Sequence, residues 1–164
     1  MEISILKTIL WQQFGAAIDM LKNAITACPE KLWDNNSKFW YTSYHTLFFL
    51  DYYLCETPEN FIPPAPFTMS EFDNKGTMPE RTYTQKELTT YLSFCQQKCH
   101  DKILSLTEEN SMRRWINSRR DYSMIEILLY NMRHVQHHTA QLNLVLRQND
   151  IPAPDWVSRT ALSL

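Results

Sequence analysis

Residues 123–148 constrain the fold more than any other segment, because their apolar side chains recur at the three- and four-residue spacing of one long helix. The apolar stripe consists of Met124, Leu128, Met132, Val135, Leu142 and Leu146. His134 and His138 lie four positions apart in the same turns, so a helix places both imidazoles on one face, with Cβ atoms about 5–6 Å apart. We therefore predict that this helix carries two ligands of one metal ion. The alternative is that one histidine is a hydrogen-bonded core residue and the other is solvated.

The composition indicates a single domain, residues 1–164, and excludes several classes of protein. A chain of 164 residues is long enough to bury a sizeable core. Its two isolated glycines, Gly15 and Gly76, cannot form the glycine-rich phosphate loops of nucleotide-binding folds. A net charge of −2 provides no basic footprint for nucleic acid.

The sequence also predicts a cytoplasmic protein. The longest apolar run, residues 39–55, is interrupted by His45 and Asp51 and does not have the composition of a membrane span. The N-terminal residues lack the basic region of a signal peptide. In the cytoplasm the four cysteines are expected to be free thiols.

Two further helices are predicted in the first third of the chain. Residues 2–27 carry apolar side chains at steps of three and four, and Pro29 follows them. Residues 34–37 then offer several N-cap side chains for a second helix over residues 38–57. Pro58 is expected to end that helix.

The middle of the chain alternates between connectors and one helix. Residues 58–83 form a proline-rich connector in which only a short helical turn near residues 69–72 is expected. Thr84 and Glu87 then form a capping box that opens a third helix. Residues 107–122 are interpreted as a second connector, which leads into the helix that carries the histidine pair.

Four long helices without a convincing strand predict an all-α fold, a four-helix bundle. The short link between the first two helices favours antiparallel neighbours. The long connector between the second and third helices could run the length of the bundle and leave these helices parallel, so we favour up-down-down-up order over up-down-up-down. The tail, residues 151–156, is expected to be extended, with Trp156 packed back against the bundle.

A metal ion held by two residues is weakly bound, so a third ligand is expected from a facing helix. His45 is the natural candidate in the second predicted helix. Aromatic residues share its helix face, at Tyr41, Phe48, Phe49 and Tyr52. The alternative for His45 is a buried neutral imidazole that is bonded to a backbone carbonyl or a tyrosine.

The arrangement of these histidines resembles a known family. A histidine early in the second helix and a His-x-x-x-His pair in the fourth, followed by Gln-Leu and Leu-Arg, resemble the DinB/YfiT-like family of small four-helix metalloproteins. The matching stretches are residues 40–54 and 129–147, and the ending at residues 151–156 is similar. The resemblance follows the helix order over essentially the whole chain. One departure is Ala140, where family members usually have glycine before the glutamine.

The resemblance implies that His45, His134 and His138 bind a divalent metal ion. Zinc and nickel are favoured, and iron and cobalt are also compatible with imidazole ligands. His137 occupies a position that varies in the family, so no ligand role is transferred to it, although it remains a rival to its neighbours on the same helical arc. Three histidines leave coordination positions open, which is typical of catalytic sites. Gln141 could orient one of the ligands, or be an ordinary bundle residue.

The resemblance also implies a class of function. Relatives in this family include metal-dependent transferases that use low-molecular-weight thiols, and others are described as metal-dependent hydrolases. A thiol S-transferase, with a small thiol beside the metal, is therefore the favoured interpretation. A metal-dependent hydrolase, a stress-related protein that binds metal without turnover, and a helical dimerisation module are alternatives, so enzymatic activity stays open. The expected partner is a small-molecule substrate, with neither nucleic acid nor membrane; a homodimer is compatible with the sequence.

Three other groups of residues are weaker candidates. Cys95 and Cys99 lie four positions apart on the third helix and could bind metal, but they also fit its apolar stripe. Asp51 and Glu56 could act as bases near His45, although neither is in clear register with it. Four arginines before the last helix could receive an anionic cofactor or belong to a solvated loop, namely Arg113, Arg114, Arg119 and Arg120.

Overall fold

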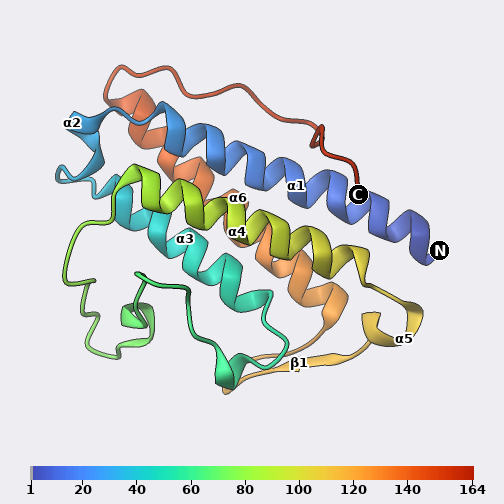
Figure 1. Cartoon of the computed structure of the whole chain (residues 1–164). Coiled ribbons are helices and arrows are strands. Elements are labelled where there is room, and N and C mark those ends of the chain that lie inside the picture. Colours follow the sequence, from blue (N-terminus) through green and yellow to red (C-terminus); the bar gives the residue numbers. More distant parts are fainter. Residues whose placement is uncertain (1) are drawn as a thin grey trace.

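The computed structural model describes residues 2–164, and this part of the chain is mostly helical (Figure 1). The four long helices are α1 (Ile3–Ala27), α3 (Phe39–Tyr53), α4 (Gln85–Leu104) and α6 (Met124–Gln148). The shorter elements are α2 (Glu30–Trp33), the 3₁₀ turns η1 (Pro58–Asn60) and η2 (Ser70–Phe72), α5 (Glu108–Ser111), and the strands β1 (Arg114–Ile116) and β2 (Asp121–Ser123). The predicted all-α class is confirmed, with one small two-stranded ladder added to it.

The long helices contact each other in pairs. α1 packs against α4 and α6, and α3 packs against the same two helices. Figure 1 shows the chain running in one direction along α1 and α6 and in the opposite direction along α3 and α4. Their apolar faces enclose one core, whose large buried side chains include Trp11, Phe14, Tyr44, Phe48 and Tyr91. Each such side chain contributes about 1.5–3 kcal/mol by burial, so packing rather than helix propensity holds the helices together.

Two of the long helices begin at the polar residues that the sequence indicates. At α4, the Thr84 hydroxyl accepts the Glu87 N–H at 3.2 Å, and the Glu87 carboxylate accepts the Thr84 N–H at 2.8 Å. This confirms the capping box. At α6, the Ser123 hydroxyl accepts the N–H of Glu126 at 3.2 Å. The start of the helix that carries the histidine pair is therefore set by local hydrogen bonds.

The second predicted helix is shorter than expected. α3 begins after Lys38, whose φ of 50° is left-handed, and no side chain of residues 34–37 caps it. It ends at Tyr53 rather than at residue 57. The helical pattern ends because the N–H groups of Leu54 and Cys55 donate to the carbonyls of Asp51 and Tyr52, three residues back, at 3.1 Å and 3.0 Å. Pro58 then prevents the helix from resuming through Thr57.

Both connectors contain structure of their own. In residues 58–83, the short turn expected near residues 69–72 is η2. At the end of the second connector, over residues 114–123, β1 and β2 pair as an antiparallel ladder, so the expectation of no strand was wrong. Strands of three residues are too short to show the alternation by which strands are recognised. The ladder is anchored by Trp115, whose side chain is buried and whose Nε1 donates to the carbonyl oxygen of Cys55 at 2.9 Å.

The C-terminal tail returns along α1 (Figure 1). The Thr160 N–H donates to the carbonyl oxygen of Gln12 at 3.1 Å. Trp156 was expected to pack against the bundle, but this residue is 70% exposed. Thr160, which is 8% exposed, packs there instead, because its small side chain occupies the space that the missing side chain of Gly15 leaves on α1.

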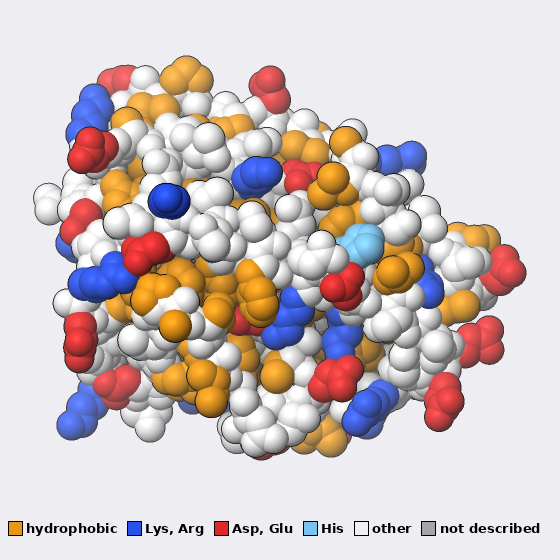
Figure 2. Space-filling model, viewed as in Figure 1, with side chains coloured by type: hydrophobic (Ala, Val, Ile, Leu, Met, Phe, Trp, Pro, Cys, Tyr) orange, Lys and Arg blue, Asp and Glu red, His pale blue; other side chains and the backbone are white. Residues whose placement is uncertain are grey.

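The surface carries charges of both signs. On the face seen in Figure 2, acidic and basic side chains are interspersed, and no continuous basic area appears in that view. Such mixed charges partly cancel at distances beyond about 10 Å in physiological salt. Across residues 2–164, no helix is both long enough and apolar enough to cross a membrane.

Candidate metal centre

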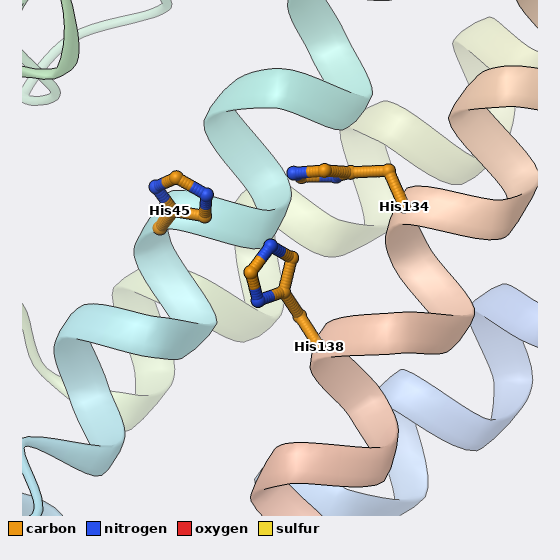
Figure 3. Close-up of side chains that lie close together, drawn as sticks. All are labelled: His45, His134 and His138. Carbon is orange, nitrogen blue, oxygen red and sulfur yellow. The ribbon is translucent and has the colours of Figure 1, made fainter.

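The structure brings together the three histidines that the sequence indicates. His45 lies in the middle of α3, and His134 and His138 lie one turn apart on the facing side of α6 (Figure 3). One ring nitrogen from each side chain lies within 4.8 Å of the other two. Within residues 2–164, no other group of three or more histidine, cysteine or acidic side chains has this spacing.

The register between α3 and α6 is set by a buried hydrogen bond beside the histidines. Asn131, on α6, is fully buried, and its Nδ2 donates to the carbonyl oxygen of Leu50 at 3.0 Å. Breaking this bond inside the core would cost about 1–3 kcal/mol, so a slip of α6 along α3 is disfavoured. In this register the ring centroids of His45 and His138 are 4.7 Å apart, and those of His45 and His134 are 5.4 Å apart.

Burial keeps two of the imidazoles uncharged. The pKa of His134 is lowered to about 3, first by burial and then by the repulsion of positive charge on His138 and His45. Burial is also the main cause that lowers the pKa of His138. A metal ion binds the deprotonated nitrogen of a neutral imidazole. Near neutral pH, these two side chains therefore have free lone pairs available for a metal ion.

Hydrogen bonds hold two of the three rings from the side away from the cluster. The Nδ1 of His45 lies 2.6 Å from Glu71 Oε2, and the Nδ1 of His138 lies 2.7 Å from Gln141 Oε1. Both oxygens accept, so each Nδ1 carries the proton and each Nε2 is free to bind an ion. Among the described residues, the buried Nδ1 of His134 has no partner.

Glu71 is a functional candidate that the sequence did not reveal. It lies on η2, inside the aperiodic connector, where an acidic residue would ordinarily be taken for part of a solvated loop. Its side chain is only 4% exposed. A buried carboxylate is uncommon without a partner. The only local signal that could have indicated it was the short helical turn expected at residues 69–72.

The structure decides between the alternative roles of Gln141 and His137 on α6. Gln141 contacts His138, in the orienting position considered for it. His137 is exposed and does not belong to the group of three, so it is not a rival ligand in this arrangement. Its Nε2 lies instead 3.3 Å from the side-chain amide of Gln141.

Aromatic rings surround the histidines on the side of α3. The ring centroid of Phe49 is 4.8 Å from that of His45 and 5.5 Å from that of His134. The ring centroid of Tyr53 is 5.9 Å from that of His134. Phe48, which was expected on the same face, is completely buried in the core. The walls of the candidate centre are therefore apolar where α3 meets α6.

A cavity of about 670 Å³, within the size range of small-molecule sites, is lined by neighbours of His45 but by none of the three histidines. Its lining includes Phe49 and Glu71, both of which contact His45. Arg119 and Arg120, from the turn between β1 and β2, also line the cavity. The aromatic part of the lining consists of Phe49, Tyr52, Phe61 and Phe72. A small molecule in this cavity would contact Phe49 and Glu71, which are neighbours of His45.

The weaker candidates have structural explanations. Cys95 and Cys99 are completely buried in the core, away from any metal-binding group found in residues 2–164. Asp51 is also buried, and it accepts hydrogen bonds from Lys98 and Tyr91 rather than facing His45. These side chains therefore stabilise the packing of α3 and α4.

The remaining charged candidates are divided between surface pairs and the cavity wall. Glu56 pairs with Lys102 at the surface, and Arg114 pairs with Asp121. Arg120 differs, because its guanidinium lies 5.5 Å and 4.8 Å from the ring centroids of Tyr53 and Tyr130 at the edge of the cavity.

Comparison with known proteins does not assign the chain to a family. No family model matches the sequence, and no curated protein matches it. The geometry of the three histidines is therefore what supports a metal centre. Two neutral rings, two Nδ1 atoms engaged from outside and three converging side chains fit a divalent ion bound by imidazole nitrogen.

Proposed function

We propose that this chain is a metal-binding protein of the DinB/YfiT-like family, and that it uses a divalent ion to activate a small thiol for transfer to an electrophile. The proposed architecture is a four-helix bundle in up-down-down-up order. The pairwise helix contacts and the chain directions in Figure 1 support this order. The motif resemblance supports the thiol chemistry.

The open coordination of the histidine cluster is the observation that carries the proposal. His45, His134 and His138 supply three nitrogen donors, and no cysteine or acidic side chain of residues 2–164 joins them within the same spacing. Structural zinc sites are closed by four protein ligands, whereas catalytic sites keep a position for water or substrate. Zinc and nickel are the favoured ions, and iron and cobalt also suit imidazole ligands.

The surroundings of the cluster suit a thiol-transfer reaction. A bound divalent ion would lower the pKa of a coordinated thiol, so that the nucleophilic thiolate is present near neutral pH. Phe49 covers one side of His45 and His134 and excludes water there. The adjoining cavity has room for a small electrophile, and Arg120 lies in its wall, where it can attract a negatively charged leaving group. The thiol proton would pass to water, the sulfur would form a bond to the electrophilic carbon, and the bond from that carbon to the leaving group would break with its electron pair going to the leaving group.

Metal analysis of protein purified without an affinity tag tests the metal centre. We expect one divalent ion per chain. Replacing His45, His134 or His138 with alanine should sharply lower the metal content, because each change removes one of three donors. His137→Ala, on the same helix, and His100→Ala, on α4, are matched controls that should retain the metal. Full occupancy in His138→Ala would remove this assignment of the site.

A conjugation screen with low-molecular-weight thiols and a panel of electrophiles tests the reaction. Turnover should show saturable dependence on thiol, disappear with a chelator and return when a divalent ion is added. The His138→Ala protein should be inactive yet retain its helical circular dichroism. Hydrolysis without conjugation would favour a metal-dependent hydrolase. No turnover in a metal-loaded protein would favour a non-catalytic metal-binding protein.

A further inference from the structure

Glu71 contacts the histidine cluster from a connector that is separated in sequence from both helices that carry the histidines. It lies on η2, and its Oε2 is 2.6 Å from the Nδ1 of His45. The Glu71 side chain is 4% exposed, whereas the His45 side chain is 28% exposed. The carboxylate is therefore largely shielded from water where it meets the imidazole. A charge-assisted hydrogen bond of this length is among the stronger ones in proteins.

The second oxygen of the same carboxylate is unusual. Glu71 Oε1 is buried and has no hydrogen-bond partner among residues 2–164. Burying a carboxylate with an unpaired oxygen is costly, and a nearby positive charge offsets that cost. The hydroxyl of Tyr41 interacts with Glu71 but supplies no positive charge; burial, the negative charge of Glu71 and a hydrogen bond to its carboxylate raise the pKa of Tyr41 to about 12.

We propose that Glu71 is a positioning residue of the metal centre, which holds His45 as the Nδ1–H tautomer with Nε2 turned towards the ion. This inference rests on the proposed metal-binding function. A carboxylate accepts but cannot donate, so the hydrogen bond selects this tautomer and also restricts rotation of the ring. Its negative charge increases the basicity of the imidazole and balances part of the charge of a divalent ion.

The η2 segment is held in place by contacts that do not involve the Glu71 carboxylate. The hydroxyl of Tyr44 donates to the carbonyl oxygen of Thr68 at 2.6 Å. The ring of Phe72 packs against those of Phe48 and Tyr52, with centroids 5.0 Å and 4.9 Å apart. Removing the carboxylate should therefore leave the connector in position, which makes substitutions of Glu71 informative about the metal centre.

The test compares Glu71→Ala and Glu71→Gln with Glu59→Gln as a matched control. Glu59 lines the same cavity from η1 and is exposed. The measurements are the zinc dissociation constant by competition with a chromophoric chelator, the absorption spectrum of the cobalt-loaded protein, and the melting temperature without metal. We expect zinc affinity to fall about 10–100-fold in Glu71→Ala, as for other residues that orient metal ligands. Glu71→Gln should lose less, because its amide oxygen can still accept from Nδ1–H.

The expected results also include an altered cobalt spectrum for both Glu71 variants and wild-type behaviour for Glu59→Gln. A folded Glu71→Ala protein with wild-type zinc affinity and spectrum would overturn the inference. If Glu71→Ala does not fold, the same measurements are made on Glu71→Gln. Wild-type zinc affinity together with a wild-type cobalt spectrum in that variant would reject the positioning role of Glu71. Failure of the wild type to bind any divalent ion would instead overturn the proposed function.

Discussion

His45 on α3 and His138 on α6 approach each other with ring centroids 4.7 Å apart, nearly as close as the 4.5 Å between His134 and His138, which are neighbours on one helix. Packing has thus added a third imidazole to a pair formed by helix geometry. Three imidazoles in such proximity cannot all be positively charged without repulsion. The arrangement therefore couples the stability of the metal-free protein to pH.

The metal-free protein should lose stability on mild acidification because of His134. Its pKa is lowered from 6.5 to about 3 in the folded state, chiefly by burial. Below pH 6.5 the unfolded chain binds a proton that the folded chain excludes, so the free energy of unfolding falls as pH decreases from 6.5 towards 3. At pH 5 the loss amounts to about 2 kcal/mol. Urea unfolding of chelator-treated protein at several pH values measures it.

The control for this pH dependence separates His134 from other acid-sensitive groups. His134→Gln should lose less stability between pH 7 and pH 5 than the wild type, because no imidazole is left to exclude a proton. His137→Gln changes an exposed histidine of the same helix and should follow the wild type. Equal slopes for wild type and His134→Gln would contradict the prediction.

The four cysteines should differ in their reactivity towards thiol reagents, and none should form a disulfide. All four are free thiols in the structure, and Cys55 is the one that is partly exposed. Burial raises the pKa of Cys28 to about 12 and also raises the pKa values of Cys95 and Cys99. Since the thiolate is the reactive form, a thiol reagent should modify Cys55 first in native protein.

Intact-mass measurement after alkylation checks this prediction. Under denaturing, non-reducing conditions, four modified thiols are expected, and two or fewer would indicate a disulfide. In native protein, the Cys55→Ser variant should lack the fast phase of modification. Persistence of that phase would show that one of the buried cysteines is accessible.

Replacing Gly15 with alanine should destabilise the attachment of the C-terminal tail. A Cβ at this position would lie 2.6 Å from the Cγ2 of Thr160. Alanine normally favours a helix interior by about 1 kcal/mol over glycine. Here the clash should outweigh that gain, with a net loss of about 1–3 kcal/mol typical of overpacking. Chemical denaturation measures the loss, and proteolysis detects release of the tail.

A double variant tests whether the clash is with Thr160. Thr160→Gly removes the side chain that a Cβ on Gly15 would meet, so the two changes together should cost less than the sum of the separate changes. Strict additivity, or stabilisation by Gly15→Ala alone, would contradict the proposed contact.

Replacing Asp51 with alanine should destabilise the core strongly. Its side chain is 2% exposed and accepts from Lys98 Nζ at 2.5 Å and from the Tyr91 hydroxyl at 2.9 Å. The change leaves the buried Tyr91 hydroxyl without its acceptor and the partly buried Lys98 ammonium with only the backbone carbonyl of residue 51, at a cost of about 3 kcal/mol. Glu56→Ala removes a carboxylate that is 66% exposed from its pair with Lys102, and it should cost less than Asp51→Ala because a solvent-exposed carboxylate gains less from pairing. Similar losses for the two variants, by urea unfolding, would refute this distinction.

Local patterns in the sequence were sufficient to predict the long helices and the proximity of two of the three histidines. The three- and four-residue spacing of apolar side chains located α1, α4 and α6, and the Thr84 capping box marked where α4 begins. The proximity of His134 and His138 also follows from sequence, because residues four apart on a helix share one face whatever the rest of the chain does. These features depend on near neighbours.

Tertiary structure decided the remainder. His45 was predicted as the third ligand from its place on a facing helix and from the motif resemblance, but its approach to α6 depends on the register that the buried Asn131 helps to set. Glu71 reaches His45 only because the connector folds over α3, and an aperiodic segment has no pattern from which that path could be read. Likewise, Thr160 rather than Trp156 anchors the tail, because the fit depends on the shape of α1 at Gly15. Close packing between distant segments selects such partners, and spacing along the chain does not encode it.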